Sequence, residues 1–598
     1  MDNKSEYNRW TKEALIKRIQ SLEAEKATFL HNAAATSLST TQPQENTVVP
    51  DLVAAVAVDD GTAAPPLKPA KKKVDRKIDP SRYSTRLVAF KLAYLGKVYG
   101  GFEFQASATL STIEEELWKA LVRSCLIFPE KPDEVRWEPW DYSKCGRTDR
   151  GVSAFGQVIG LRVRSNRPLS RKRGKSPATV AAQEQTADSK QEDASTNTSP
   201  AEEDIEEEEL AEEKPFDDHT DEIQYCRILN RLLPPDIRMI AWCPDVSANF
   251  SARHECAERQ YRYFFTQPAY SPVPNILENP KATMPNGVKD GWLDIEAMRV
   301  AAKKFEGLHD FRNFCKVDPG KLIKNFKRRI FECDVVEVKD AATALTHLQQ
   351  GDFRSPHLDK IQGAIDSETY PKVYYFHVRG SAFLWHQIRC MVSVLFTIGQ
   401  GLETPEVLDA MLDPTRHPRR PNYTLASDMP LVLWDCIFPD LRITNAPGAD
   451  PAAPKVDNMR WIYEGEENPL GKHGVSGLVD QLWEGWRERK VDEILAGQLL
   501  NLVASGTLSG DVTKRLDRKA PAHMSLSQRA FEGDNRDRIV GKWVPLLKRG
   551  TLAAPEETYD KEARRKGYKD ADDWRAARAK KWEGIPRHNL PPVEDGDE

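Results

Sequence analysis

The chain has 598 residues, 40% of them hydrophobic, with a formal net charge of -5 and nine cysteines that are widely scattered. Its length predicts several domains, and no apolar run approaches a membrane span or the core of a signal peptide, so we expect a protein of the nucleus, the cytoplasm or both. Because no Cys-x-x-Cys pair is present, composition argues against a zinc site and a disulfide framework.

Residues 1–84 are predicted to be an appendage to the folded body. Apolar side chains recur near helical spacing after Thr11, which predicts a short amphipathic helix over Thr11–Lys26. The following stretch is rich in Ala, Thr and Pro and is predicted to be disordered. The basic run at residues 71–77 is compatible with a nuclear address, a phosphate-binding arm or ordinary solvated charge.

Acidic charge is concentrated in one stretch. Ala201–Glu222 holds thirteen acidic residues and one lysine, so the remainder of the chain is net positive. A basic body with an acidic segment is typical of proteins that face RNA or DNA, although a solvated surface produces the same composition. We predict that residues 167–222 form a disordered insertion in a loop, since the entropy of loop closure grows slowly with length.

Residues 85–166 are predicted to form the first half of a catalytic domain. A strand, a glycine- and aromatic-rich loop, a helix and a second strand follow one another, which is half of a ferredoxin-like unit. Thr112 and Glu115 are spaced as a capping box at the start of the helix. These four elements are expected at residues 87–94, 95–105, 111–126 and 157–163.

Residues 223–440 are predicted to form the second half. Helices are expected at 226–233, 293–305 and 382–398, and strands at 237–242, at the end of 253–265, and at 328–338, 372–379 and 431–438. Two such halves predict an α+β fold, with one broad, mostly antiparallel sheet and helices on one face. Residues 441–598 are predicted to be a helical, partly disordered extension, with helices at 475–486, 491–503 and 559–581 and a docking peptide at 543–549.

A glycine-rich loop carries the clearest chemical signal. Three glycines punctuate Lys144–Val163, whose last residues alternate as in a half-buried strand. Arg147, Thr148 and Asp149 stand between the first two glycines. A tight turn that feeds a strand holds a carboxylate in fixed geometry, so Asp149 is a candidate nucleophile or general base. A plain surface turn would have the same composition.

Two residues beyond the loop are suited to a nucleic-acid site. Tyr261 lies in an aromatic strand and can stack on a base, an interaction worth roughly 1–3 kcal/mol, although strand tyrosines also serve as core residues. Arg389 lies on an otherwise apolar helix, where a guanidinium needs an acidic partner unless it reaches the surface.

Taken in order, three segments resemble the three motifs of the TruA-type pseudouridine synthases. The segments are Gly146–Val158, Arg253–Phe265 and Arg379–Gly401. Within that family the chain is most similar to the eukaryotic branch that acts on tRNA positions 38 and 39. Bacterial members carry an aspartate after the tyrosine that Tyr94 matches, whereas Leu95 stands there in this chain, as in the eukaryotic branch. Further segments that are similar to this branch are Tyr94–Gln105, His309–Asp318 and Leu15–Glu23.

The resemblance implies the pseudouridine synthase fold, with a central catalytic cleft between the two halves of the sheet. It also implies that uridine is isomerised to pseudouridine in the tRNA anticodon stem-loop, without a metal or cofactor, by a homodimer. It implies that Asp149 is the catalytic aspartate and that Arg147 enters the stem-loop as the target base flips out. Tyr261 would stack on that base, and Arg389 would pair with Asp149. The candidate substrate-binding residues are Leu431, Thr148, Gly146, Lys144, Phe383 and Gln157.

Two alternative functions stay open. The chain would act on other uridines of tRNA or another RNA, or it would be a non-catalytic RNA-binding protein of the same fold. The route of attack is also open, because an aspartate can attack C1′ of the ribose or C6 of the base, or abstract a proton on the way to a glycal. A zinc-dependent base deaminase is disfavoured, since no His-x-Glu occurs with a Pro-Cys-x-x-Cys.

Overall fold

The computed structural model describes residues 79–169, 215–272, 290–339, 371–440, 453–466, 477–506 and 528–581, together with 288, 450 and 472–474. The chain divides into two units after Arg76, and every described residue belongs to the second. The predicted helix over Thr11–Lys26, the basic run and most of the acidic insertion lie outside the described residues. None of the helices in these ranges has a stretch long and apolar enough to cross a bilayer.

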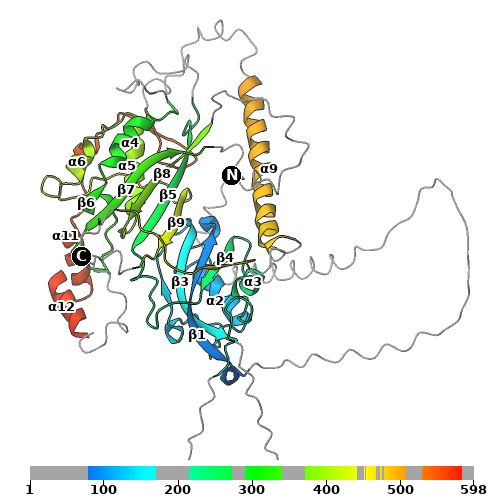
Figure 1. The fold of residues 1–598 in the computed structure, drawn as a ribbon. Coiled ribbons are helices and arrows are strands. Elements are labelled where there is room, and N and C mark those ends of the chain that lie inside the picture. The colour runs from blue at the N-terminus through cyan, green and yellow to red at the C-terminus, as the bar shows by residue number, and fades with distance from the viewer. Residues whose placement is uncertain are drawn as a thin grey trace, which may run out of the picture. The chain divides into compact units, whose positions relative to one another are not determined.

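A ten-stranded sheet organises the described part of the chain (Figure 1). The strand order is β10-β4-β1-β3-β9-β5-β8-β7-β6, with β2 paired to β3, and every pairing except β3 with β9 is antiparallel. The predicted mixed fold with a large, mostly antiparallel sheet is therefore confirmed, while its division into two ferredoxin-like halves stays a prediction. The strands are β1 Ser84–Tyr94, β2 Ser143–Lys144, β3 Ser153–Ser165, β4 Ile237–Cys243, β5 Glu258–Gln267, β6 Gly307–Asp310, β7 Lys327–Glu337, β8 Lys372–Gly380, β9 Leu431–Ile437 and β10 Ile462–Tyr463.

Two hydrophobic cores lie along the sheet, on either side of the parallel pairing between β3 and β9. The first core gathers β1, β3 and β4 with helices α2 (Ile113–Arg123) and α3 (Tyr225–Asn230). The second gathers β5, β7 and β8 with α4 (Ile295–Lys303), α5 (Gln387–Gly399) and α6 (Val407–Met411). Tyr261 on β5 packs against both cores, so it lies where they meet.

Local sequence signals explain several of these elements. The Thr112 hydroxyl accepts a hydrogen bond from the Glu115 backbone N–H at 3.3 Å, so α2 begins at the predicted cap. β3 is buried at nearly every position because it is a central strand with neighbours on both sides. By contrast α5 begins at Gln387, five residues later than predicted, because His386 adopts a left-handed backbone with φ of 61°.

The predicted boundary between the halves is misplaced. β4, which the sequence assigns to residues 223–440, pairs antiparallel with β1 from Ala89 opposite Cys243 to Tyr94 opposite Ile237. Side chains of α3 and β4 belong to the first core, because β4 completes the sheet next to β1. The first half of the folded body therefore continues well beyond residue 223.

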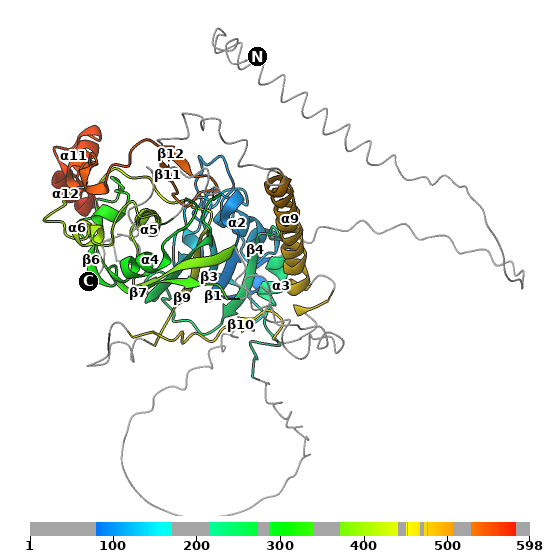
Figure 2. The same cartoon turned by 90° about the horizontal axis from the view of Figure 1, so that it is seen from above.

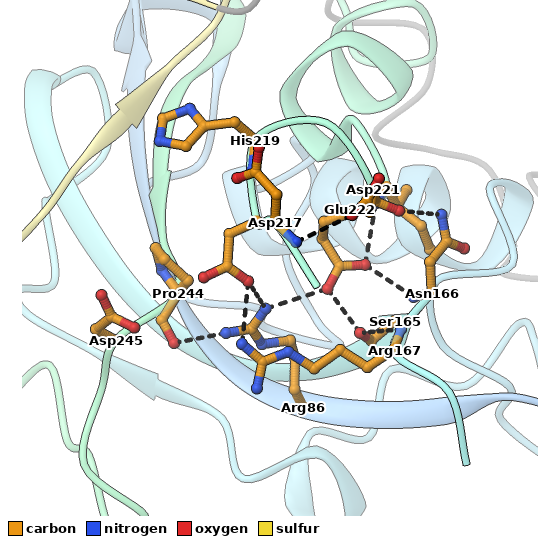
Figure 3. A network of polar contacts seen from close by, with 12 residues as sticks. Arg86, Ser165, Asn166, Arg167, Asp217, His219, Asp221, Glu222, Pro244 and Asp245 are labelled. Atoms are coloured by element: carbon orange, nitrogen blue, oxygen red, sulfur yellow. Dashed lines mark hydrogen bonds and ion pairs between the residues drawn. The ribbon is translucent and has the colours of Figure 1, made fainter. Parts of the chain in front are cut away.

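A polar network holds the two ends of the acidic insertion together (Figure 3). The Arg86 guanidinium on β1 donates to Asp218 at 2.6 Å and to Glu222 at 3.1 Å. Glu222 in turn accepts from the Ser165 hydroxyl at 2.6 Å and from the Asn166 backbone N–H at 2.8 Å. Glu222 is only 5% exposed, so residues 215–222, which the sequence assigns to a disordered segment, are part of the folded body.

Much of the C-terminal extension also packs on the body. β10 pairs with β4, and Leu546, Tyr559 and Trp574 enter the second core. The segment 543–549, predicted to be a docking peptide, packs on the body: Leu546 is 1% exposed and the Trp543 indole donates to Glu403 at 3.0 Å. Figures 1 and 2 both show the last two helices next to each other. The elements are α9 Leu478–Gly506, where two helices were predicted, β11 Gln528–Ala530, β12 Arg538–Val540, α11 Pro555–Arg565 and α12 Ala571–Lys581.

We predict that Glu222→Gln lowers the free energy of unfolding by about 1–3 kcal/mol, because it removes a buried charged acceptor from the network. Burial opposes ionisation, but the bonds from Ser165, Asn166 and Arg86 leave the pKa of Glu222 below its usual range. A lowered pKa in the folded state stabilises the fold above the ordinary glutamate pKa, and this contribution is lost as the pH falls through the folded-state pKa.

Urea denaturation over a series of falling pH values measures this difference. The gap between the parent and Glu222→Gln should be largest near neutral pH and narrow in acid. The exposed Glu130→Gln is the control. If both variants are as stable as the parent at neutral pH, the network does not stabilise the fold.

Candidate active site

The glycine-rich loop between β2 and β3 is held from inside the first core. The fully buried Gln157 donates from Nε2 to the Gly146 carbonyl at 2.8 Å and accepts the Gly146 N–H at 3.2 Å. The Thr148 hydroxyl shares a hydrogen bond of 2.7 Å with Tyr94, and the Phe102 N–H donates to the Thr148 carbonyl at 3.1 Å. Gly146, Thr148 and Gln157 therefore fix the loop that carries Asp149.

Close packing explains two glycines near this loop. Gly151 has φ of +80°, and a Cβ there would lie 2.9 Å from the carboxylate of Asp428. A Cβ at Gly96 would lie 2.0 Å from the Val152 carbonyl oxygen. The loop therefore leaves no room for side chains at either position.

Two side chains from the other half of the sheet reach Asp149. The indole Nε1–H of Trp385 donates to Asp149 Oδ1 at 3.0 Å, and Nε2 of His386 lies 3.3 Å from Oδ2. Both residues belong to the short loop before α5, in the segment that was predicted to be helical. Neither was selected from the sequence, although both lie inside Arg379–Gly401.

The environment of Asp149 opposes its ionisation. Burial raises the pKa of its carboxyl above the ordinary 3.8, and the hydrogen bond from Trp385 and the positive charge of Arg389 only partly lower it. Burial and the charges of Arg389 and Lys316 lower the pKa of His386 to about 4. The imidazole is therefore neutral near pH 7, so its 3.3 Å contact with the Asp149 carboxylate is not an ion pair.

The predicted pair between Arg389 and Asp149 is replaced by another arrangement. Nε of Arg389 donates to the Ala426 carbonyl at 2.8 Å, and one terminal nitrogen lies 3.8 Å from the Asp428 carboxylate. Among the ion pairs of the described residues, Arg389 is thus paired with Asp428 and not, as predicted, with Asp149. Arg389 still lowers the pKa of Asp149 through its charge, while Trp385 and His386 make the direct contacts.

The two cations of the loop share an acidic neighbour. Lys144 Nζ and Arg147 Nε lie 3.0 and 3.1 Å from the Glu103 carboxylate. Lys144 also contacts the buried Glu114 at 2.6 Å, whereas the Arg147 side chain is 33% exposed. An anion that approaches the loop would therefore compete with Glu103 for Arg147.

Aromatic and aliphatic candidates lie on β5, on β9 and near the end of β8. Tyr261 pairs with Val378 and Leu433 in the sheet, and its ring meets that of Phe383 edge to face, with centroids 5.2 Å apart. Burial raises the pKa of the Tyr261 hydroxyl, so the ring is neutral. Leu431 is 5% exposed and lies opposite Tyr263 in the sheet.

One arginine ties the three motif segments together. The guanidinium of Arg259 donates to the backbone carbonyls of Cys145 at 3.1 Å, Arg253 at 3.0 Å and Ser381 at 2.7 Å. Because each carbonyl belongs to a different part of the site, these bonds fix the distance between segments remote in sequence. The motifs that were recognised separately are therefore neighbours in the fold.

Comparison with known proteins gives consistent matches. A family model described as tRNA pseudouridine synthase matches residues 301–439. The tRNA pseudouridine(38/39) synthase of Bos taurus is 36% identical over 411 residues, which are 69% of this chain and 63% of that protein. The human protein of the same name gives the same values. The protein of that name from Saccharomyces cerevisiae is 32% identical over 459 residues, 76% of this chain and 75% of its own length. The chain thus spans less than two thirds of the mammalian relatives.

We predict that Gly151→Ala destabilises the fold by about 1–3 kcal/mol, because a non-glycine residue in the left-handed region is strained and its Cβ would displace Asp428. The measurement is the midpoint of thermal unfolding. Gly541→Ala is the matched control, since a Cβ there meets nothing within 4 Å. Equal midpoints for the two variants would show that the loop relaxes without cost.

Proposed function

Since the chain belongs to the tRNA pseudouridine synthase family, we propose that it isomerises uridine to pseudouridine at positions 38 and 39 of the tRNA anticodon stem-loop. The observation that carries this proposal is the meeting of three motif segments around Asp149, which is held by Trp385 and His386. The names of the mammalian and yeast relatives support the choice of positions.

The target nucleotide must leave the stem-loop before its base can be detached and turned. Flipping costs a few kcal/mol. Stacking of the base on Tyr261 would recover roughly 1–3 kcal/mol of that cost. Arg147 would leave Glu103 and occupy the space that the base vacates, and Leu431 and Phe383 would line the pocket around Tyr261. Lys144 would remain on the buried Glu114 and keep the loop in place.

The reaction then needs one ionised carboxylate. Asp149 would attack C1′ or C6, or abstract a proton on the way to a glycal, and the bond between N1 and C1′ would break. The uracil turns within the pocket and rejoins through C5, whose proton leaves as N1 regains one. The hydrogen bond from Trp385 and the contact with His386 would fix the carboxylate during these steps.

The resemblance also supports proposals about assembly and location. We propose that two copies of the chain form a homodimer around a cleft between the halves of the sheet, and that the protein acts in the nucleus, the cytoplasm or both. Cross-linking of the full chain with and without tRNA measures the first, and localisation of a tagged chain measures the second.

Sequencing of modified positions in a tRNA transcript tests the proposed reaction. A transcript with uridines at positions 38 and 39 should gain pseudouridine at those sites, and transcripts in which each uridine is replaced by cytidine should lose the corresponding signal. Modification elsewhere would favour a synthase of other uridines. Binding without any conversion would favour a non-catalytic RNA-binding protein.

We predict that Asp149→Ala and Asp149→Asn reduce single-turnover conversion by at least about 10⁴-fold, the scale on which a catalytic unit fails when a member is removed. Binding of tRNA should persist, because phosphate contacts provide most of the affinity. Filter binding and tritium release from C5-labelled uridine measure the two quantities. The exposed Asp133→Ala is the control, and near-parental rates in either Asp149 variant would rule out Asp149 as the catalytic group.

We predict that the single-turnover rate rises with pH through the pKa of Asp149, above the ordinary value of 3.8, because only the ionised form reacts. Trp385→Phe removes a hydrogen bond that lowers this pKa, so the acid limb should move to higher pH. Trp461→Phe is a matched control. It also removes a hydrogen bond from an indole to a carboxylate, that of Asp457 at 2.8 Å, but this bond lies next to β10, at the edge of the sheet and away from Asp149. An unchanged acid limb in Trp385→Phe would contradict this role.

A further inference from the structure

Three cysteines that are far apart in the sequence meet beneath the glycine-rich loop. The sulfur atoms of Cys145, Cys256 and Cys436 all lie within 4.8 Å of one another, and the three residues are at most 6% exposed. They come from the start of the loop, the segment before β5, and β9. Spacing along the chain gave no hint of this cluster, because the pairing of β9 with β5 creates it.

A buried cation adjoins the three thiols. Arg259 follows Cys256 by three residues and donates to the carbonyls of Cys145 and Cys256. Among the described residues no carboxylate forms an ion pair with Arg259, and the neighbouring Glu258 is bonded to Arg379 instead. A guanidinium in such surroundings needs a compensating negative charge.

The three thiols are the nearest groups that could supply that charge, because the Arg259 guanidinium donates to the backbone carbonyls of two of the three cysteines.

We propose that Cys145, Cys256 and Cys436 bind a zinc ion that supports the active-site loop from below. Zinc binds thiolate sulfur at about 2.3 Å, which places tetrahedrally arranged sulfurs about 3.8 Å apart. Sulfur separations of no more than 4.8 Å therefore require only small shifts. Binding would release the thiol protons, and the zinc with three thiolates would carry one negative charge, which matches the single positive charge of Arg259.

The net charge of the occupied cluster also favours zinc over other occupants. A copper(I) ion with three thiolates would carry two negative charges and leave an excess beside Arg259. A disulfide between two of the cysteines would need sulfurs about 2.05 Å apart and would remove the anion that Arg259 requires. The zinc would have a structural role, since Cys145 directly precedes Gly146 and its carbonyl is bonded to Arg259.

Metal content of the full chain tests this proposal independently of activity. The protein purified from zinc-supplemented cells should contain one zinc ion per chain by mass spectrometry of the metal. After removal of zinc with a chelator, added cobalt(II) should produce the intense absorption of thiolate-to-cobalt charge transfer. Cys436→Ala should lose both signals, with an affinity at least ~100-fold weaker.

Cys333→Ala is the matched control, because Cys333 is equally buried but lies in the second core. It should keep the zinc and the cobalt absorption. If Cys436→Ala fails to fold, the zinc content and the cobalt absorption of the wild-type chain still test the proposal. A wild-type chain without zinc and without cobalt–thiolate absorption would overturn the proposal, as would a cluster disulfide found by mass spectrometry of non-reduced peptides. Persistence of the cobalt absorption in a folded Cys436→Ala protein would overturn it as well.

Discussion

The site depends on the one parallel strand pair in the ten-stranded sheet, β3 with β9. This pairing joins two cores that otherwise have separate helices and separate antiparallel ladders. The loop that carries Asp149 leads into β3, whereas Trp385 and His386 precede a helix that packs in the second core. A change in register between β3 and β9 would therefore separate the carboxylate from Trp385 and His386. It would also disturb the packing of both cores, because β9 contributes Leu431 to the second core and Leu433 to the first. The bonds of Arg259 to three loops oppose such a change.

The electrostatics of Asp149 combine two opposing requirements. A carboxylate that is partly withdrawn from water is a better nucleophile than a fully solvated one, but burial also favours its protonated form. In this structure the neutral side chains of Trp385 and His386 make the direct contacts, and the Arg389 cation is paired with Asp428. Neutral side chains fix the position of the oxygens without quenching their charge as a direct ion pair would. In the proposed reaction this arrangement would keep the carboxylate both oriented and reactive.

Regular elements and recognisable motifs could be predicted from the sequence, and their mutual contacts could not. The cap at Thr112, the alternation in β3 and the apolar stripe of α5 are local patterns, so their elements were found near the correct positions. The contribution of β4 to the first core, the pairing of Arg389 with Asp428 and the contacts of Trp385 and His386 with Asp149 depend on strand order, which no local pattern encodes. For the same reason the nine cysteines seemed scattered, although three of them share one site.

Because Arg86, Asp218 and Glu222 form a network at the base of the acidic insertion, the geometry of the fold does not depend on the length of that insertion. Both ends of that insertion are bonded to the ends of β1 and β3. The register of these strands therefore does not depend on the sequence between the two ends. The insertion point is therefore a natural place to graft a fluorescent reporter or an affinity handle. Orthologous chains should tolerate large gains and losses of sequence at this position while their strands stay in register.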